Sequence, residues 1–213
     1  MAFNKLKNQL WTPARDEYVT APEHVNLEPN PALADKNTDV DWDMIKEFEG
    51  GVSKEGYVPK AGNSGVTVGA GFDIGQQAHL EGLHPELKEK LKPYLGLKKQ
   101  DAERKLAEDG LSLGQHEADA VTKYGQDMMN DSLKNQWKKV SDVPFDQLTP
   151  AQQTVLQSVQ YQYGDLSRTP RFAQFAGKGQ WEKVVKELRN FKDSYKTRRG
   201  READYLADSL KKK

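Results

Sequence analysis

The spacing of apolar residues changes along the chain and divides it into a short helix, a small sheet and a mostly helical body. Residues 39–51 carry an apolar stripe behind two aspartates that can cap a helix, and they end in two glycines. Residues 57–73 contain turn residues followed by strict alternation of apolar and polar positions, which is typical of a small antiparallel sheet. Beyond Ile74 the apolar residues recur every three to four positions, which predicts amphipathic helices.

The helical body contains one long predicted helix. Residues 115–140 carry apolar side chains at helical spacing, enough for a helix of roughly 35 Å at about 1.5 Å per residue, with Gly125 as its weak point. Thr149-Pro150-Ala151-Gln152 combines a threonine N-cap, a proline at the first helical position and a glutamine that completes a capping box. The helix that begins there is expected to end at Gly164. Further helices are expected over residues 86–95, 99–109, 181–188 and 199–210.

Composition narrows the chemistry that the chain can perform. Its 213 residues include 32 lysines and arginines, 32 aspartates and glutamates, four histidines and no cysteine. The balanced charge gives no overall field that would attract nucleic acid or an acidic membrane, so neither is an expected partner. The absence of cysteine excludes disulfides, thiol catalysis and cysteine-ligated zinc, and the histidines show no metal-ligand spacing. We therefore expect no metal and no cofactor.

Residues 1–40 differ from the rest of the chain because they are polar, contain several prolines and lack a helical or strand period. We interpret them as an N-terminal extension, either a linker or a delivery segment, and residues 41–213 as one domain. No apolar run approaches the roughly 20 residues that span a bilayer, and residues 1–13 lack the apolar core of a signal peptide. Synthesis in the cytoplasm without a signal peptide is therefore expected.

Glu49 is the first candidate for acid catalysis. It is the last side chain of the predicted short helix, directly before two glycines. The negative end of the helix dipole and packing near Phe48 and Val52 would both disfavour ionisation of its carboxyl group. Hydrolysis of a glycosidic bond needs such an acid to protonate the leaving oxygen, together with a second carboxylate. Exposed glutamates are common, so a catalytic role for Glu49 depends on the residues that follow it.

The glycine-rich strand after Glu49 supplies a hydroxyl and a second carboxylate. Thr67 and Asp73 share one face of the strand, and Gly69 and Gly71 between them leave room for a sugar. Six extended residues would span about 20 Å, too far for both groups to act on one bond. We therefore predict a bend or bulge at Gly69 or Gly71 that returns Asp73 towards Thr67. A turn role for Asp73 and an ordinary strand role for Thr67 are the alternatives.

The segment Glu49-Gly50, followed by Thr67-Val68-Gly69-Ala70-Gly71, resembles the active-site segment of phage-type lysozymes. Residues 145–164 resemble their central buried helix, and residues 181–182 and 198–203 resemble their C-terminal helices. This resemblance covers residues 41–210. It implies an α+β, mostly helical, lysozyme-like fold in which a small antiparallel β-lobe and a helical lobe are joined by a long helix.

One departure from that pattern favours a particular branch of these enzymes. Phage lysozymes carry an aspartate between the glutamate and the threonine, whereas Glu55 is the only acidic residue in that interval here. The chain is more similar to pesticin-like muramidases, in which the aspartate follows the threonine as Asp73 follows Thr67. The resemblance implies that Glu49 is the general acid and Asp73 the second carboxylate, with Glu55 as the alternative. It implies that Thr67 positions water or substrate.

Two groups of residues later in the chain add to this picture. Tyr161 and Gln162 match positions that line the cleft of phage lysozymes, so the resemblance implies that they bind substrate, although a tyrosine there can also belong to the core. Arg198, Arg199 and Arg201 form a basic cluster that we expect to be a solvated turn near the carbonyl end of a helix. Contact with the carboxylates of peptidoglycan is the alternative.

The expected function is hydrolysis of peptidoglycan at the β-1,4 bond between N-acetylmuramic acid and N-acetylglucosamine, by a bacteriolytic phage endolysin or a secreted or injected toxin. A lytic transglycosylase and a non-catalytic cell-wall-binding module are the alternatives. The expected partners are glycan strands and, as the resemblance allows, an immunity protein or delivery machinery. We expect a monomer that acts in the periplasm or cell wall after phage- or secretion-mediated delivery.

Overall fold

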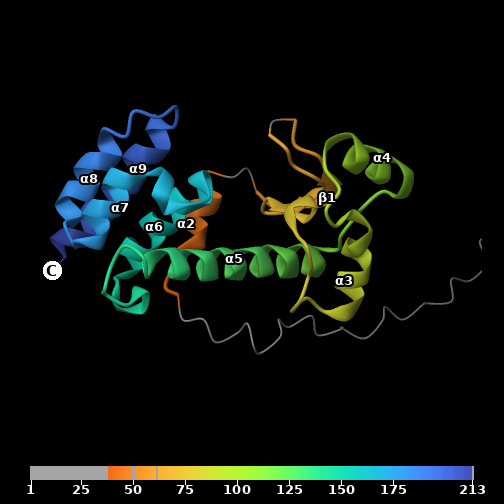
Figure 1. Cartoon of the computed structure of the whole chain (residues 1–213), viewed down its shortest axis with the longest axis horizontal. Coiled ribbons are helices and arrows are strands. Elements are labelled where there is room, and N and C mark those ends of the chain that lie inside the picture. The colour runs from red at the N-terminus through yellow and green to blue at the C-terminus, as the bar shows by residue number, and fades with distance from the viewer. Residues whose placement is uncertain (1–37, 49–50, 61, 213) are drawn as a thin grey trace, which may run out of the picture.

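The structure, a computed structural model, describes residues 38–48, 51–60 and 62–212, which form two lobes joined by one long helix (Figure 1). The β-lobe contains β1 (Ser53–Tyr57), β2 (Thr67–Gly69), β3 (Phe72–Asp73), α3 (Pro85–Leu91), α4 (Lys99–Asp109) and the short 3-10 helices η1 (Ile74–Gln76) and η2 (Lys92–Tyr94). The helical lobe contains α2 (Trp42–Lys46), α6 (Pro150–Tyr163), α7 (Pro170–Gly177), α8 (Trp181–Arg189), α9 (Lys196–Lys211), η3 (Phe145–Gln147) and η4 (Leu166–Arg168). The connecting helix is α5 (Gln115–Trp137), and the expected α+β, mostly helical architecture is confirmed. Within the described ranges, no helix has both the length and the apolar character needed to span a membrane.

Each lobe has its own hydrophobic core, and α5 contributes to both. Val121, near its N-terminal end, is buried with the apolar residues of the β-lobe, whereas Leu133 and Trp137 are buried in the helical lobe. The helix ends at Trp137, earlier than expected, because the carbonyl of Trp137 accepts the N–H of Val140 (2.9 Å) in a closing turn. One straight element thus fixes both lobes and leaves a space between them on one side.

The central helix α6 begins and ends where the sequence predicts. The N–H of Thr149 donates to Oε1 of Gln152 (2.9 Å), and the N–H of Gln152 donates back to Oγ1 of Thr149 (3.4 Å), which completes the capping box. Gly164 ends the helix with a φ of 78°. Residues 151–160 are all buried, which confirms the prediction of a central buried helix. Its C-terminal end faces the space between the lobes (Figure 1).

Helix α7 is missing from the sequence-based expectation. It has only eight residues, and Pro170 at its first position is the single clear start signal. Its apolar residues Phe172, Ala173 and Ala176 are buried in the core of the helical lobe. A helix this short carries about two repeats of its apolar spacing, which is too few for a periodic pattern to stand out.

The described chain starts against the helical lobe. The N–H of Asp39 donates to Oε1 of Gln153 (2.9 Å), and the N–H of Asp41 donates to Oγ1 of Thr154 (2.8 Å), so both contact α6. Asp41 also caps α2 by accepting the N–H of Met44 (3.0 Å). Most of the predicted extension, residues 1–37, lies outside the described residues, and its boundary at residue 40 stays a prediction.

Candidate active-site cleft

The strands β2 and β3 form a tight antiparallel hairpin at the edge of the space between the lobes. The sheet order is β1-β2-β3, and Thr67 lies directly opposite Asp73 in the register. The turn between them contains Gly69 (φ 61°) and Gly71 (φ 87°), backbone conformations that favour glycine. The predicted return of Asp73 towards Thr67 is confirmed. It takes the form of a hairpin turn that uses both glycines, rather than a bulge in one strand.

The backbone of Gly65 connects the two side chains of this pair. Its N–H donates to Oδ1 of Asp73 (3.1 Å), and its carbonyl accepts the hydroxyl of Thr67 (3.3 Å). A Cβ at Gly65 would lie 2.1 Å from the carbonyl oxygen of Leu97 and 2.6 Å from Cα of Gly75. Three backbone segments therefore meet here without side chains, and this close packing fixes the peptide that orients the Asp73 carboxylate.

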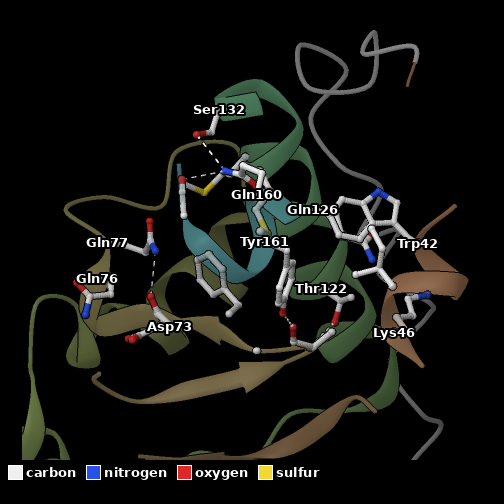
Figure 2. A pocket seen from close by; sticks show the side chains of 18 residues that line it. Trp42, Lys46, Asp73, Gln76, Gln77, Thr122, Gln126, Ser132, Gln160 and Tyr161 are labelled. Carbon is white, nitrogen blue, oxygen red and sulfur yellow. Dashed lines mark hydrogen bonds between the residues drawn. The ribbon is translucent and has the colours of Figure 1, made fainter. Parts of the chain in front are cut away.

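The tip of the hairpin is held by two helices. The N–H of Ala70 donates to Oγ1 of Thr122 on α5 (3.0 Å), and the carbonyl of Ala70 accepts the hydroxyl of Tyr161 on α6 (2.9 Å). Figure 2 shows Tyr161 reaching down to this turn between Asp73 and Trp42. Because Tyr161 belongs to the helical lobe and Ala70 to the β-lobe, this hydrogen bond joins the lobes across the space between them.

That space is a cleft of about 660 Å³, within the range of small-molecule sites (Figure 2). Its wall combines apolar surface with amide side chains, which suits a ligand with both apolar and hydrogen-bonding faces. Its lining residues are Trp42, Ile45, Lys46, Ala70, Gly71, Phe72, Asp73, Gln76, Gln77, Thr122, Gly125, Gln126, Met128, Met129, Ser132, Gln160, Tyr161 and Gly164. Asp73 is the one carboxylate among these described residues. Within the same described part of the chain, no cluster of metal-ligating side chains is found.

The structure brings some of the predicted site residues together and separates others. Asp73 and Tyr161 line the cleft, whereas Thr67 is buried behind it with 2% of its surface exposed. Glu55 lies on β1 outside the cleft, where its Oε1 accepts the hydroxyl of Ser112 (2.7 Å). Glu49 lies outside the described residues.

The prediction that Gln162 lines the cleft is wrong. It does not line the cleft, because its side chain turns to the other side of α6 and accepts a hydrogen bond from the Arg199 guanidinium. Adjacent residues on a helix point about 100° apart. Gln160 and Tyr161 therefore face the cleft, whereas the next step around α6 places Gln162 on the side of Arg199.

A family model described as pesticin, a bacterial toxin homologue of phage lysozyme, C-terminal part, matches residues 39–182, more than half of the chain. The chain belongs to the pesticin family. A search of curated proteins gave no match. Membership of the pesticin family supports, in general terms, a muramidase-like toxin with glycoside hydrolase activity. The two-lobed fold, with its cleft beside the small sheet, agrees with this lysozyme homology.

Several cleft residues of this pesticin-family chain are missing from the sequence-based expectation, and Trp42 is the most prominent. It begins α2 and meets Tyr161 edge-on, with 6.5 Å between the ring centroids. Gln126 and Gln160 add amide groups from α5 and α6 (Figure 2). The sequence did offer a signal for Trp42: this tryptophan lies next to the apolar stripe of the short helix but outside it, so it was free to face a ligand. The sequence offered no such signal for the two glutamines, because polar residues on helices are usually exposed.

The hydrogen bond between Tyr161 and Ala70 gives a stability prediction. Tyr161→Phe removes the donor and leaves the Ala70 carbonyl without it, so we expect a loss of about 0.5–1.5 kcal/mol in the free energy of unfolding. Urea unfolding followed by circular dichroism measures this loss. Tyr195→Phe is the matched control, because the Tyr195 side chain is 53% exposed, and it should be neutral. Equal stability of the two variants would mean that the contact between the lobes contributes nothing.

A second hollow, which we call the polar groove, lies on the other side of Tyr161. Its volume is about 710 Å³, and it is bounded by Glu47 and Phe48 after α2, by Tyr161 and Gln162 on α6, and by residues 194–198 and Arg201 at the start of α9. Arg198 packs under it, with its guanidinium carbon 4.9 Å from the centroid of the Phe48 ring. The cleft and the polar groove thus share one wall.

A buried network of ion pairs lies beneath the polar groove and overturns the expectation of a solvated basic turn. Arg198 and Arg199 are buried on α9, and only Arg201 of the cluster is exposed. Glu202, also fully buried, accepts hydrogen bonds from both buried guanidinium groups, and Asp193 pairs with Arg199 at 2.8 Å. Buried arginines need such partners, because an unpaired buried charge is very costly.

The charges of this network shift the pKa values of its members. Burial alone would raise the pKa of Asp193, but hydrogen bonds from Arg199, Tyr163 and the N–H of Tyr195 outweigh it and hold the pKa below its usual value. Burial would lower the pKa of Arg199, but the carboxylates of Glu202 and Asp193 outweigh it and raise the pKa. Burial, followed by the nearby Asp193 carboxylate, raises the pKa of Tyr163. The shifts of Asp193 and Arg199 favour their charged, paired forms, and the shift of Tyr163 keeps its phenol protonated so that it can donate to Asp193.

The lowered pKa of Asp193 predicts how stability depends on acid. An unfolded aspartate has a pKa of about 3.9, so the stabilisation by Asp193 is complete above that pH and is lost as pH falls through its lower folded pKa. Asp193→Asn should therefore be less stable than the wild type at pH 7, and the difference should shrink below about pH 4. Urea unfolding at pH 7, 4 and 3 measures it. A difference that grows on acidification would contradict the assignment.

Proposed function

We propose that this protein is a peptidoglycan hydrolase that cleaves the β-1,4 bond between N-acetylmuramic acid and N-acetylglucosamine. The observation that supports it best is the position of Asp73, the one carboxylate among the described cleft residues, opposite Thr67 on a hairpin between two lobes of a pesticin-family chain. Glu55 is disfavoured as the second carboxylate because it lies outside the cleft.

The proposed mechanism divides the work between two carboxyl groups. Glu49 protonates the leaving glycosidic oxygen, and Asp73 either activates the attacking water or attacks the sugar itself as an oxocarbenium-like transition state forms. Thr67 acts on Asp73 through Gly65, since it holds the carbonyl of the same residue whose N–H orients the carboxylate. Thr67 is therefore a positioning residue, buried behind the cleft rather than exposed in it.

The cleft wall suits an N-acetylated sugar. Trp42 and Tyr161 offer aromatic surface against which the apolar face of a pyranose ring can lie. Gln126 and Gln160 supply amide groups that can exchange hydrogen bonds with acetamido and hydroxyl groups. The proposed chemistry uses these side chains and water, and it calls for no cofactor.

The test is turbidity clearing of purified peptidoglycan, followed by mass spectrometry of the products. Clearing with reducing muropeptide ends supports hydrolysis, and 1,6-anhydro ends would replace it with lytic transglycosylation. Binding to peptidoglycan without any clearing would establish a non-catalytic wall-binding module. Glu55→Gln serves as the matched carboxylate control and should clear at the wild-type rate, because Glu55 does not line the cleft and accepts a hydrogen bond from Ser112 instead.

We further propose that the enzyme works as a monomer, is made in the cytoplasm and reaches the cell wall by phage- or secretion-mediated delivery. Residues 1–40 are the candidate delivery segment because of their proline-rich, aperiodic sequence. A toxin of this kind would require an immunity protein in the producing cell. Co-purification from the producer tests this partner, and a producer that tolerates periplasmic expression with no partner would refute it.

A further inference from the structure

The polar groove has the dimensions and chemistry of a second ligand site. Its volume of about 710 Å³ is comparable to that of the cleft and admits a short peptide. Two exposed cations reach it from the first turns of α9: Lys196, and Arg201, whose guanidinium contacts Glu47 at 2.6 Å. Lys196 makes no ion pair with any residue in the described part of the chain.

Among the described residues, the groove carries an excess of positive charge at its rim. The buried arginines beneath it pair with Glu202 and Asp193, and the exposed charged side chains among the described residues of the rim are Lys196, Arg201 and Glu47. In this described part of the rim, two cations against one carboxylate favour an anionic ligand. The contact between Arg201 and Glu47 is exposed on both sides, at 56% and 54%, so a ligand carboxylate can replace Glu47 at little cost.

The groove begins where the cleft ends. Tyr161 lines both the cleft and the groove. At the end of α2, Lys46 lines the cleft, whereas the next two residues, Glu47 and Phe48, line the groove. A substituent that projects past Tyr161 from a glycan in the cleft would therefore lie next to the groove. In the proposed substrate, the muramic acid residues carry such a substituent, a lactyl-linked peptide with free carboxylates.

We propose that the polar groove binds the acidic stem peptide of peptidoglycan, with Lys196 and Arg201 pairing with its carboxylates. This inference rests on the proposed hydrolase function and names a second recognition element of the same substrate. It makes the enzyme selective for peptide-bearing glycan over the bare sugar polymer.

The decisive experiment compares two substrates. Purified peptidoglycan is used intact or after an amidase has removed its stem peptides, and initial rates give KM and kcat for each. For Lys196→Gln/Arg201→Gln we expect KM to rise about fivefold to twentyfold on intact peptidoglycan, which corresponds to two solvent-exposed charge contacts. On stripped glycan the variant should match the wild type. Added salt should reduce the difference between the two proteins on intact substrate.

The matched control is Lys186→Gln/Arg189→Gln on α8. It removes the same two charges from the helical lobe, and Arg189 is also in an exposed ion pair, with Asp204 at 2.8 Å, but neither residue lines the polar groove. Its kinetics should match the wild type on both substrates. An equal loss by the groove variant on both substrates, or no loss on either, would overturn the inference.

Direct binding separates this inference from the proposed hydrolysis. Titration of a free stem tetrapeptide into the wild type should release or absorb heat, and the signal should be lost in the groove variant. If the wild type cleaves neither substrate, the hydrolase proposal fails, while peptide binding that depends on Lys196 and Arg201 still supports the groove. If the wild type cleaves both substrates and peptide binding is absent, the groove proposal fails alone. An acidic protein that binds this face in place of the peptide would also overturn it.

Discussion

Asp73→Asn is expected to lower kcat on peptidoglycan by about 10²- to 10⁴-fold, nearly as much as Glu49→Gln, because each removes one of the two proposed acid–base groups. The asparagine keeps an oxygen at the position that accepts the N–H of Gly65 at 3.1 Å, so the hairpin should stay folded while the charge disappears. KM should change little, since the sugar contacts of the cleft remain. Initial rates of turbidity clearing and circular dichroism measure the two effects.

Two controls make this result specific to the position of the carboxylate. Asp119→Asn removes the same charge from an exposed position on α5 and should retain the wild-type rate. Glu55→Gln tests the other carboxylate that the sequence offers, and it should also be active. Near-normal turnover by Asp73→Asn would remove Asp73 from the mechanism, and inactive Glu55→Gln would transfer its role to Glu55.

The hairpin shows how far sequence alone reaches into this site. The alternation of side chains places Thr67 and Asp73 on one face, and the distance between them demands a bend at the glycines, which the structure confirms. The contact that orients Asp73 was beyond prediction. It depends on Gly65, Gly75 and the Leu97 carbonyl, and their close approach is a tertiary event that no local pattern records.

The basic cluster shows where sequence reasoning fails. Arginines are usually exposed, so a surface position for Arg198 and Arg199 is the natural expectation. Their burial depends on residues far away in the chain: Arg198 donates to the carbonyl of Ser158 (3.1 Å), 40 positions earlier, and Arg199 donates to Gln162. The same network takes Gln162 out of the cleft. The contact between Arg199 and Gln162 thus moves a residue that was predicted to line the cleft to the wall of the polar groove.

Glu202→Gln is expected to give the largest loss of stability, about 3–5 kcal/mol in the free energy of unfolding. Glu202 is fully buried and pairs with both Arg198 and Arg199, so its neutralisation removes a buried counter-charge that two buried guanidinium groups share. Glutamine fills the same volume and can still accept a hydrogen bond, which makes the loss electrostatic rather than a matter of packing. Urea unfolding at pH 7 measures it against the wild type.

The matched control for Glu202→Gln is Asp208→Asn on the same helix. Asp208 pairs with Lys211 at 2.9 Å, but both side chains are exposed, so its removal should cost less than about 1 kcal/mol. A Glu202→Gln variant as stable as Asp208→Asn would show that the two guanidinium groups find other partners or water. The structure beneath the polar groove would then not depend on the Glu202 carboxylate.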